Sequence, residues 1–207
     1  MKDLSLSPLI YEWAIEPLLR VIKRKVARLV YRYELSPVLD LCCGTGKQGH
    51  FINLGGNRIY GLDRSFRMLS YARKKHTEVP FICADAACLP CRSGVFKGII
   101  LSYSLHEKPE KIRHEILKEC RRLLSLGGKI IFVDYENPWN RLSRFGGLLT
   151  WLIERTARGD HYKNSRQFLT KGGLRSFIRK HGLFEVKSYD LALGCSRLVV
   201  TQLSSDF

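Results

Sequence analysis

Residues 38–49 read Val-Leu-Asp-Leu-Cys-Cys-Gly-Thr-Gly-Lys-Gln-Gly, which joins a short apolar run to a glycine-rich turn. The run from Val38 to Leu41 is typical of a buried strand, and the glycines that follow let the backbone approach a ligand because they carry no Cβ atom. A helix that begins at this turn aims free backbone N–H groups at whatever binds there. The stretch therefore predicts a nucleotide-like ligand at the edge of an α/β sheet.

Apolar runs and helical segments alternate on both sides of this turn. The runs expected to form five parallel strands are residues 38–41, 58–62, 80–83, 98–103 and 129–134. Such an alternation is typical of a parallel sheet with helices on both faces. Two more β-like runs, 183–189 and 197–203, lie too close together for a parallel crossover. We therefore expect an α/β fold with a Rossmann-like, seven-stranded, mostly parallel sheet and a C-terminal antiparallel hairpin.

The helices outside this alternation differ in character. Residues 17–33 predict a helix with one apolar face and one basic face, which suits packing on its own domain or lying on an anionic membrane. After the fifth strand, the sequence predicts a helix over 139–157 and a polar loop over 158–164. Ser165 is expected to cap a further helix that runs to His181.

The length of 207 residues suits one α/β domain with a modest extension. We expect residues 1–35 to form basic amphipathic helices that cover the ligand site, and residues 36–207 to form the main domain. Within that domain, residues 138–165 are expected to form a helical cover over a substrate.

The formal net charge of +16 indicates an acidic environment or partner, such as nucleic acid, an anionic membrane or an acidic substrate, unless the charge is simply a solvated surface. Seven cysteines, an odd number, and an N-terminus without a long apolar core favour reduced thiols in the cytoplasm. Cys83, Cys88 and Cys91 match an iron–sulfur spacing, but no fourth cysteine follows at a fitting place, so we expect no metal.

The turn by itself suggests a dinucleotide. Residues 44–49 match G-x-G-x-x-G, and Asp63 follows at the distance of the ribose-binding acid of NAD sites. Two further acids argue for another ligand. Asp40 precedes the glycines, where it would repel a pyrophosphate and welcome an amine, and Asp85 follows the third strand. Three acids at the carboxyl edge of the sheet favour a cationic ligand with hydroxyl and amine donors, such as S-adenosylmethionine.

The same motifs, taken in order, resemble the class I S-adenosylmethionine-dependent methyltransferases. They are Val38–Gly46, Asp63, Ala84-Asp85-Ala86, Leu123–Gly128 and the closing hairpin. Within this class the chain looks most similar to the small-molecule group that includes the ubiquinone and menaquinone methyltransferases. The resemblance implies S-adenosylmethionine as cofactor and S-adenosylhomocysteine as product.

The resemblance also implies roles for individual residues. Asp63 would accept hydrogen bonds from the ribose hydroxyls, and Asp85 with Ala86 would bind adenine. Ser102 and the segment after it would lie beside the methyl group. The full set of expected cofactor-binding residues is Tyr11, Asp40, Cys42, Gly44, Thr45, Gly46, Asp63, Arg64, Met68, Asp85, Ala86, Ser102 and Tyr103. One departure is visible, since Cys42 replaces the first glycine of the D-x-G-x-G-x-G pattern and cannot take a positive φ freely.

Two clusters are candidates for the chemistry of transfer. His106 follows the fourth strand, where the methyl group is expected, and imidazole is suited to act as a base near neutral pH. Glu107 is expected to orient His106, although both residues would also suit a simple helix cap. His161 and Tyr162 lie in the polar loop expected to reach the substrate, and Tyr162, Tyr135, Tyr103 and Tyr11 are candidates for an aromatic wall near the sulfonium.

The leading functional hypothesis is therefore methyl transfer to a small molecule, with an apolar or quinone-like acceptor as one candidate. A methyltransferase for RNA or protein is the alternative that the charge suggests, but the chain reads Ser102-Tyr103-Ser104-Leu105 where an amine-methylating N-P-P-Y or D-P-P-Y tetrapeptide would stand. A third hypothesis is an NAD-dependent oxidoreductase or a non-catalytic cofactor-binding protein. Peripheral membrane contact through the basic helix stays open, as does the oligomeric state.

Overall fold

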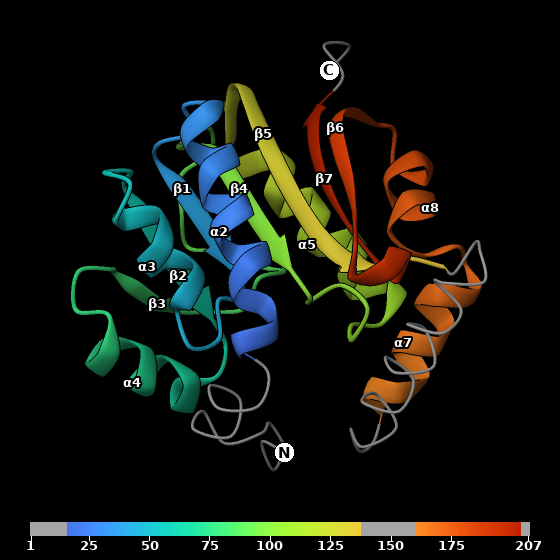
Figure 1. Cartoon of the computed structure of the whole chain (residues 1–207), viewed down its shortest axis with the longest axis horizontal. Helices are drawn as coiled ribbons and strands as arrows, with labels where there is room; N and C mark the ends of the chain where they lie inside the picture. Colours follow the sequence, from blue (N-terminus) through green and yellow to red (C-terminus); the bar gives the residue numbers. More distant parts are fainter. Residues whose placement is uncertain (1–15, 138–159, 204–207) are drawn as a thin grey trace. The chain divides into compact units, whose positions relative to one another are not determined.

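The structure, a computed structural model, describes residues 16–137 and 160–203. The elements in chain order are α2 (Glu16–Arg32), β1 (Val38–Leu41), α3 (Lys47–Asn53), β2 (Ile59–Asp63), α4 (Phe66–Lys75), β3 (Phe81–Cys83), β4 (Phe96–Ser102), α5 (Glu110–Leu123), β5 (Leu124–Tyr135), α7 (Asp160–Thr170), α8 (Gly173–Lys180), β6 (Leu183–Leu191), the 3-10 turn η1 (Ala192–Gly194) and β7 (Ser196–Leu203) (Figure 1). Tyr11 and the predicted helix over 139–157 lie outside the described residues.

The seven strands form one mixed sheet in the order β3-β2-β1-β4-β5-β7-β6. β1 pairs with β2 and β2 with β3 in parallel, whereas β7 runs antiparallel to both β5 and β6. The predicted Rossmann-like sheet with a terminal antiparallel hairpin is therefore confirmed. The described residues form two compact units, 16–100 with 122–128 and 101–121 with 129–137 and 160–203.

In the first unit, the parallel register aligns the ends of three strands. Asp40 pairs with Gly61 across β1 and β2, and Asp63 pairs with Cys83 across β2 and β3. Every residue of β1 is buried, as expected for a parallel strand covered on both faces. The register therefore brings the acid of β1 and the acid of β2 to the same edge of the sheet, where the glycine turn begins.

Helix α2 covers part of this unit with its apolar side. Val26, Leu29 and Val30 are buried, and α2 lies beside α3 (Figure 1). The guanidinium of Arg24 lies 5.5 Å from the ring centroid of Phe51 on α3, which is a favourable cation–π distance. The prediction that this helix packs on its own domain is confirmed.

The second unit consists of the terminal hairpin and the helices that precede it. β6 and β7 pair from Leu183↔Leu203 to Leu191↔Ser196, α8 packs against β6, and α7 packs against α8. β6 is the edge strand, and most of its residues are exposed or half-buried. The single bulge between Glu185 and Lys187 interrupts the register, a common feature of edge strands.

The prediction of a polar loop over 158–164 was wrong for the described part of that range. Residues from Asp160 onward form α7, and Ser165 is a buried residue inside this helix rather than its cap. The loop was inferred from polar composition. A helix with a half-buried polar face has the same composition, so composition could not distinguish the two.

The helix predicted to run from Ser165 to His181 is instead two helices. Gly172 and Gly173 separate α7 from α8 and have φ values of 95° and 63°, which glycine adopts without a steric penalty. The buried carboxylate of Glu136 accepts a hydrogen bond from the backbone N–H of Arg175 in the first turn of α8. A Cβ atom on Gly173 would lie 3.0 Å from Glu136 Oε1, so the glycine also makes room for this contact.

The start of the fifth strand was also mispredicted. β5 begins at Leu124, and Gly127 and Gly128 lie inside it rather than in a turn before Lys129. Gly128 has no space for a side chain, because a Cβ atom there would lie 2.7 Å from Leu124 Cγ and 3.0 Å from the carbonyl oxygen of Lys97. Close backbone approach, and not only turn formation, therefore explains this glycine.

None of the helices in the described ranges is both long and apolar enough to cross a membrane. All seven cysteines lie in the described ranges, and no two of them are joined by a disulfide there.

Replacing Gly46 with alanine should lower the free energy of unfolding by about 2–5 kcal/mol, since it adds left-handed strain to an overpacked contact. Gly46 has a φ of 77°, and a Cβ atom would lie 2.5 Å from Phe81 Cζ and 3.1 Å from Ala72 Cβ. Gly44→Ala is the matched control, because Gly44 has a φ of 54° but no atom within 4 Å of its Cβ position. Urea unfolding of both variants tests this, and equal losses would contradict the role of the Phe81 contact.

Candidate functional site

The glycine turn leaves β1 through three residues with positive φ. Cys42, Gly44 and Gly46 have φ values of 60°, 54° and 77°, and Gly46 is the N-terminal cap of α3. Cys42 therefore adopts the left-handed backbone conformation at the place of the first glycine of the D-x-G-x-G-x-G pattern. This conformation costs about 1–2 kcal/mol for a residue with a side chain. The space beside Gly44 is open, whereas Gly46 is packed against Phe81. The turn thus presents open backbone on the Gly44 side.

Asp63 at the end of β2 fixes this turn. Its Oδ2 accepts a hydrogen bond of 2.9 Å from the Gly44 N–H, and its Oδ1 accepts one of 2.9 Å from the Ser65 N–H. Ser65 caps α4, as predicted, by accepting a hydrogen bond from the Met68 N–H. A carboxylate has about four acceptor sites, so each oxygen of Asp63 retains capacity for a ligand hydroxyl.

Asp40 is the buried acid of the site. It is 2% exposed, and its Oδ2 has no hydrogen-bond partner among the described residues. Burial raises the pKa of Asp40 to about 7, the charge of Lys23 partly opposes the rise, and Asp63 adds to it. A buried carboxylate oxygen without a partner is costly, and a cationic N–H donor would relieve that cost.

Lys23 departs from the prediction that it lies on the exposed basic side of α2. It is 7% exposed, and its backbone carbonyl accepts a hydrogen bond of 3.0 Å from Gln48 Nε2 of α3. Two more buried polar atoms of the turn, Thr45 Oγ1 and Gln48 Oε1, have no partner among the described residues. The neighbourhood of Asp40 is therefore rich in buried polar groups that a bound ligand can satisfy.

The remaining predicted cofactor residues of this unit lie at its surface or in its turns. Asp85 is exposed, and its Oδ1 accepts a hydrogen bond of 2.9 Å from the Ala87 N–H, which leaves its second oxygen for a ligand. Ala86 is buried. Arg64 is exposed, and Met68 is half-buried in the first turn of α4.

The stability of the protein without ligand should fall as pH rises from about 4 to 7, by about 1.4 kcal/mol per pH unit from Asp40 alone. The pKa of Asp40 is raised from 3.8 to about 7, so the folded state holds a proton that the unfolded state has released. The difference in unfolding free energy between wild type and Asp40→Asn, measured with urea across this range, isolates the effect. The exposed Asp85→Asn is the control, and parallel wild-type and Asp40→Asn curves would contradict the raised pKa.

In the second unit, His106 is held by Asp134 at the end of β5. His106 Nδ1 lies 2.6 Å from Asp134 Oδ1, and both side chains are almost fully buried. Asp134 also accepts hydrogen bonds from the backbone N–H groups of Leu105 and Tyr135. A carboxylate that accepts from Nδ1–H fixes the tautomer in which Nε2 can take up a proton.

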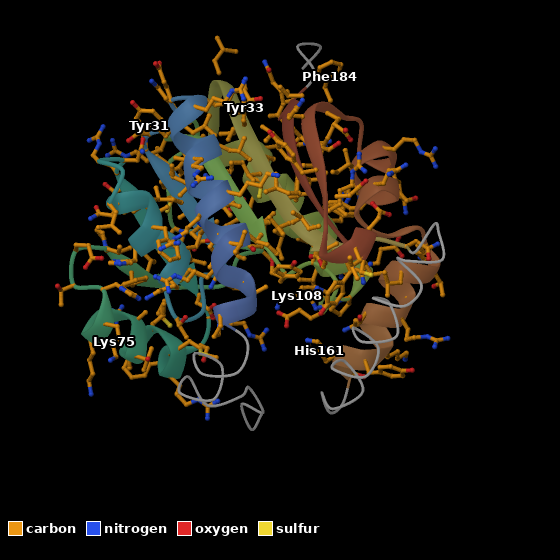
Figure 2. All side chains as sticks on the ribbon, viewed as in Figure 1. Tyr31, Tyr33, Lys75, Lys108, His161 and Phe184 are labelled. Atoms are coloured by element: carbon orange, nitrogen blue, oxygen red, sulfur yellow. The ribbon has the colours of Figure 1, made fainter. Side chains whose placement is uncertain are left out.

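Glu107 was predicted to orient His106, a role that Asp134 fills at His106 Nδ1. Glu107 is paired instead with His161 Nε2, at 3.2 Å, and with the ammonium of Lys108, and Figure 2 shows Lys108 and His161 near each other. Burial by itself would raise the pKa of Glu107, but the hydrogen bonds from His161 and Lys108 outweigh it and lower the pKa to about 2. Glu107 is therefore ionised at neutral pH and is unsuited to accept a proton.

Aromatic rings surround His106. Its ring centroid lies 4.2 Å from that of Tyr135 and 5.5 Å from that of His161, and Tyr135 lies 5.8 Å from Tyr103. The two tyrosines predicted to form part of an aromatic wall, Tyr103 and Tyr135, do lie together. Tyr162 is half-buried on α7.

The residues around the end of β4 complete this cluster. Ser102 is half-buried, and the backbone N–H of Tyr103 donates a hydrogen bond of 2.7 Å to the carbonyl of Val133. The buried hydroxyl of Ser104 has no hydrogen-bond partner among the described residues. The cluster thus presents an imidazole, two tyrosines and an unsatisfied hydroxyl, a set suited to a polar head on an aromatic molecule.

Sequence reasoning missed two residues that hold this cluster. Asp134 was seen only as a strand end, although an acid that closes an apolar strand was the same signal that identified Asp63. The buried Arg113 donates to the carbonyls of Leu105 and Asn164, and Asn164, a member of the predicted polar loop, donates from Nδ2 to the carbonyl of Glu107. No local pattern marks Arg113, because its partner Asn164 lies 51 residues away in the sequence.

The fold and the turn together define a protein of the S-adenosylmethionine-binding α/β class. Residues 38–128 match the methyltransferase domain family. The chain is 30% identical to a 2-phytyl-1,4-naphtoquinone methyltransferase of Thermosynechococcus vestitus over 186 residues, covering 81% of this chain and 80% of that protein. It is also 30% identical to a demethylmenaquinone methyltransferase of Lactococcus lactis over 65% of this chain and 51% of that protein.

A solved structure of a Pyrococcus horikoshii protein has the same fold, with a TM-score of 0.71, 21% identity and 92% of each chain covered. The chain belongs to the class I S-adenosylmethionine-dependent methyltransferase family, whose cofactor is S-adenosylmethionine. It spans about half the length of some of the curated relatives that it matches.

Proposed function

We propose that this chain transfers a methyl group from S-adenosylmethionine to a small aromatic acceptor of the quinol type, whose nucleophilic atom loses a proton. The observation that carries the proposal is the buried His106–Asp134 pair with its 2.6 Å contact. A base is required only when the attacking atom carries a proton that must leave, so the pair favours such an acceptor.

The residues of the first unit fit the cofactor that the family uses. The unpartnered Oδ2 of Asp40 suits the ammonium group of its methionine part. Asp63 retains acceptor sites for the ribose hydroxyls, and the exposed oxygen of Asp85 suits the adenine amine. When bound, S-adenosylmethionine supplies an electrophilic methyl group on a sulfonium. Asp40, the glycine turn and Asp63 bind and orient it, which is the main source of acceleration in an in-line transfer.

His106 Nε2 then takes the proton from the acceptor, and Asp134 stabilises the imidazolium that forms. The same carboxylate holds the backbone of Leu105 and Tyr135, so the base is positioned by the strand end rather than by a mobile side chain. Tyr103 and Tyr135 provide flat apolar surface for an aromatic acceptor, and the Ser104 hydroxyl is available to its oxygen.

The names of two relatives support the acceptor class, because one acts on 2-phytyl-1,4-naphtoquinone and the other on demethylmenaquinone. We extend this to the chain as a naphthoquinol-like acceptor. The division into residues 1–35, 36–207 and a substrate cover over 138–165 is part of the same proposal, as is a location in the cytoplasm. Catalytic roles for His161 and Tyr162 are also part of the proposal, and the contact of His161 with Glu107 supports a place for His161 beside the His106 loop.

The experiment that tests the proposal has two parts. Thermal-shift titration should show stabilisation by S-adenosylmethionine and S-adenosylhomocysteine and none by NAD. Transfer of a labelled methyl group should then be measured to a reduced naphthoquinone, to bulk RNA and to a protein mixture. Label on the naphthoquinol alone is the expected result. Stabilisation by NAD only would overturn the cofactor assignment, and label on RNA or protein only would overturn the acceptor class.

A further inference from the structure

Helix α2 carries a continuous basic stripe on its exposed side. Arg20, Arg24, Arg28 and Arg32 recur at intervals of four residues, and all four are exposed. Residues four apart lie on one face of a helix, so the stripe runs along the helix for about 18 Å. The mechanism proposed above uses none of these side chains.

Two large apolar side chains interrupt the charges of this stripe. Val21 is 75% exposed and Tyr31 is 71% exposed. At 100° per residue, both fall within the arc that the four arginines define. Figure 2 places Tyr31 near the C-terminal end of α2. Apolar side chains that are exposed to water among arginines are not stabilised there, whereas their transfer into a lipid headgroup region is favourable.

The other side of α2 is already committed. Val26, Leu29 and Val30 are buried, and Lys23 lies beside Asp40. Arg24 belongs to the exposed stripe, although its guanidinium also lies 5.5 Å from the ring centroid of Phe51. Helix α2 therefore keeps one orientation on its unit and presents the stripe outward. Lys47 also lies over the Phe51 ring, at 5.8 Å, which adds a fifth cation beside the stripe.

We propose that this stripe docks the protein on the surface of an anionic lipid membrane. The charge of the stripe is complementary to acidic headgroups, and its arginines span an arc of about 120° on the outward side of the helix. Val21 and Tyr31, within this arc, supply apolar contacts that the phosphates of a nucleic acid would not stabilise. Docking on a membrane would serve the proposed function, but it does not depend on the proposed proton transfer to His106. A naphthoquinol-like acceptor is apolar and resides in lipid, so docking brings the enzyme to the phase that holds it.

Flotation with lipid vesicles tests the docking directly. The full chain should bind phosphatidylcholine vesicles that contain phosphatidylglycerol and should not bind pure phosphatidylcholine vesicles. Binding should weaken as salt is raised, because exposed charges are screened. Arg20→Glu/Arg28→Glu should weaken binding to the mixed vesicles by about 25-fold or more, at roughly fivefold for each arginine lost.

The matched control is Lys74→Glu/Lys75→Glu on α4. These lysines are also exposed, Figure 2 shows Lys75 on α4, and each double variant lowers the net charge of +16 by the same four units. The control should bind vesicles within about threefold of wild type, since its charges lie off the stripe. Equal losses of vesicle affinity in both double variants would show that net charge, and not the position of the stripe, causes binding.

Two further outcomes also decide the proposal. Val21→Ser/Tyr31→Ser should weaken vesicle binding with charge unchanged, and an unchanged affinity would show that no apolar side chain enters the lipid. Binding of wild type to a short single-stranded RNA but not to either vesicle would overturn lipid in favour of nucleic acid. All variants are compared by melting temperature and by S-adenosylhomocysteine binding, so a failure of docking is separable from a failure of the cofactor site.

Discussion

His106→Ala should lower turnover by about 10²–10⁴-fold and leave the affinity for S-adenosylmethionine within about threefold, as expected for loss of a general base. His106 belongs to the second unit and contacts Asp134 and Tyr135, whereas the predicted cofactor contacts of Asp40 and Asp63 belong to the first. Single-turnover methyl transfer and calorimetric cofactor binding separate the two quantities.

Two companion variants make this test specific. Asp134→Asn should also lower turnover by more than about tenfold, because the amide no longer fixes the tautomer of His106 as a carboxylate does. Glu107→Gln should stay within about threefold, since Glu107 pairs with His161 and Lys108 rather than with His106. Partial recovery of His106→Ala by added imidazole would support a proton-transfer role. Full activity in His106→Ala would remove the base from the mechanism.

Asp63→Ala should weaken binding of S-adenosylmethionine by about 10²–10⁴-fold, from two lost hydrogen bonds to a charged group at about 1.5–3 kcal/mol each. The substitution has two effects on cofactor binding. It removes the side chain that faces the ribose in the proposed site, and it removes the acceptor that holds the Gly44 and Ser65 N–H groups in place. Asp63→Asn should lose less, since its single amide oxygen still accepts from one backbone N–H.

The control for this second prediction is Asp85→Ala. Asp85 is exposed, and its side chain accepts a hydrogen bond from the Ala87 N–H, so its removal should cost about tenfold or less in affinity. Circular dichroism and melting temperature establish that each variant is folded. Equal affinities of wild type and Asp63→Ala would exclude Asp63 as a ribose ligand.

The sequence predicted the local structure of the first unit, with its glycine turn, far better than that of the second unit, which carries His106. The glycine turn, the cap at Ser65 and the acids that close β1 and β2 depend on neighbours within a few residues, so local patterns reveal them. The partner of His106 lies 28 residues away at the end of another strand, and the sequence offered the adjacent Glu107 instead. Packing also overrode composition at Asp160–Thr170, where polar residues form a helix.

The charge of a side chain also failed to indicate whether that side chain is buried. Lys23 has the same sequence environment as the arginines around it, yet it is buried beside Asp40 while they are exposed. The sequence pattern placed Lys23 with these arginines on the basic face, and the packing of α2 against α3 shows that it is buried instead. The same holds for Arg113, a buried cation whose partners include the carbonyl of Asn164.

The bonds from Arg113 and Asn164 also bear on the order in which the chain folds. The glycine turn is closed by contacts that span 19 to 25 residues, from Asp63 to Gly44 and from Gln48 to Lys23. The His106 loop is closed by contacts that span 51 to 57 residues, from Arg113 to Asn164 and from Asn164 to Glu107. Short loops close at lower entropic cost than long ones. During synthesis the contacts of Arg113 and Glu107 with Asn164 can therefore form only after α7 has left the ribosome, later than the contacts that close the glycine turn.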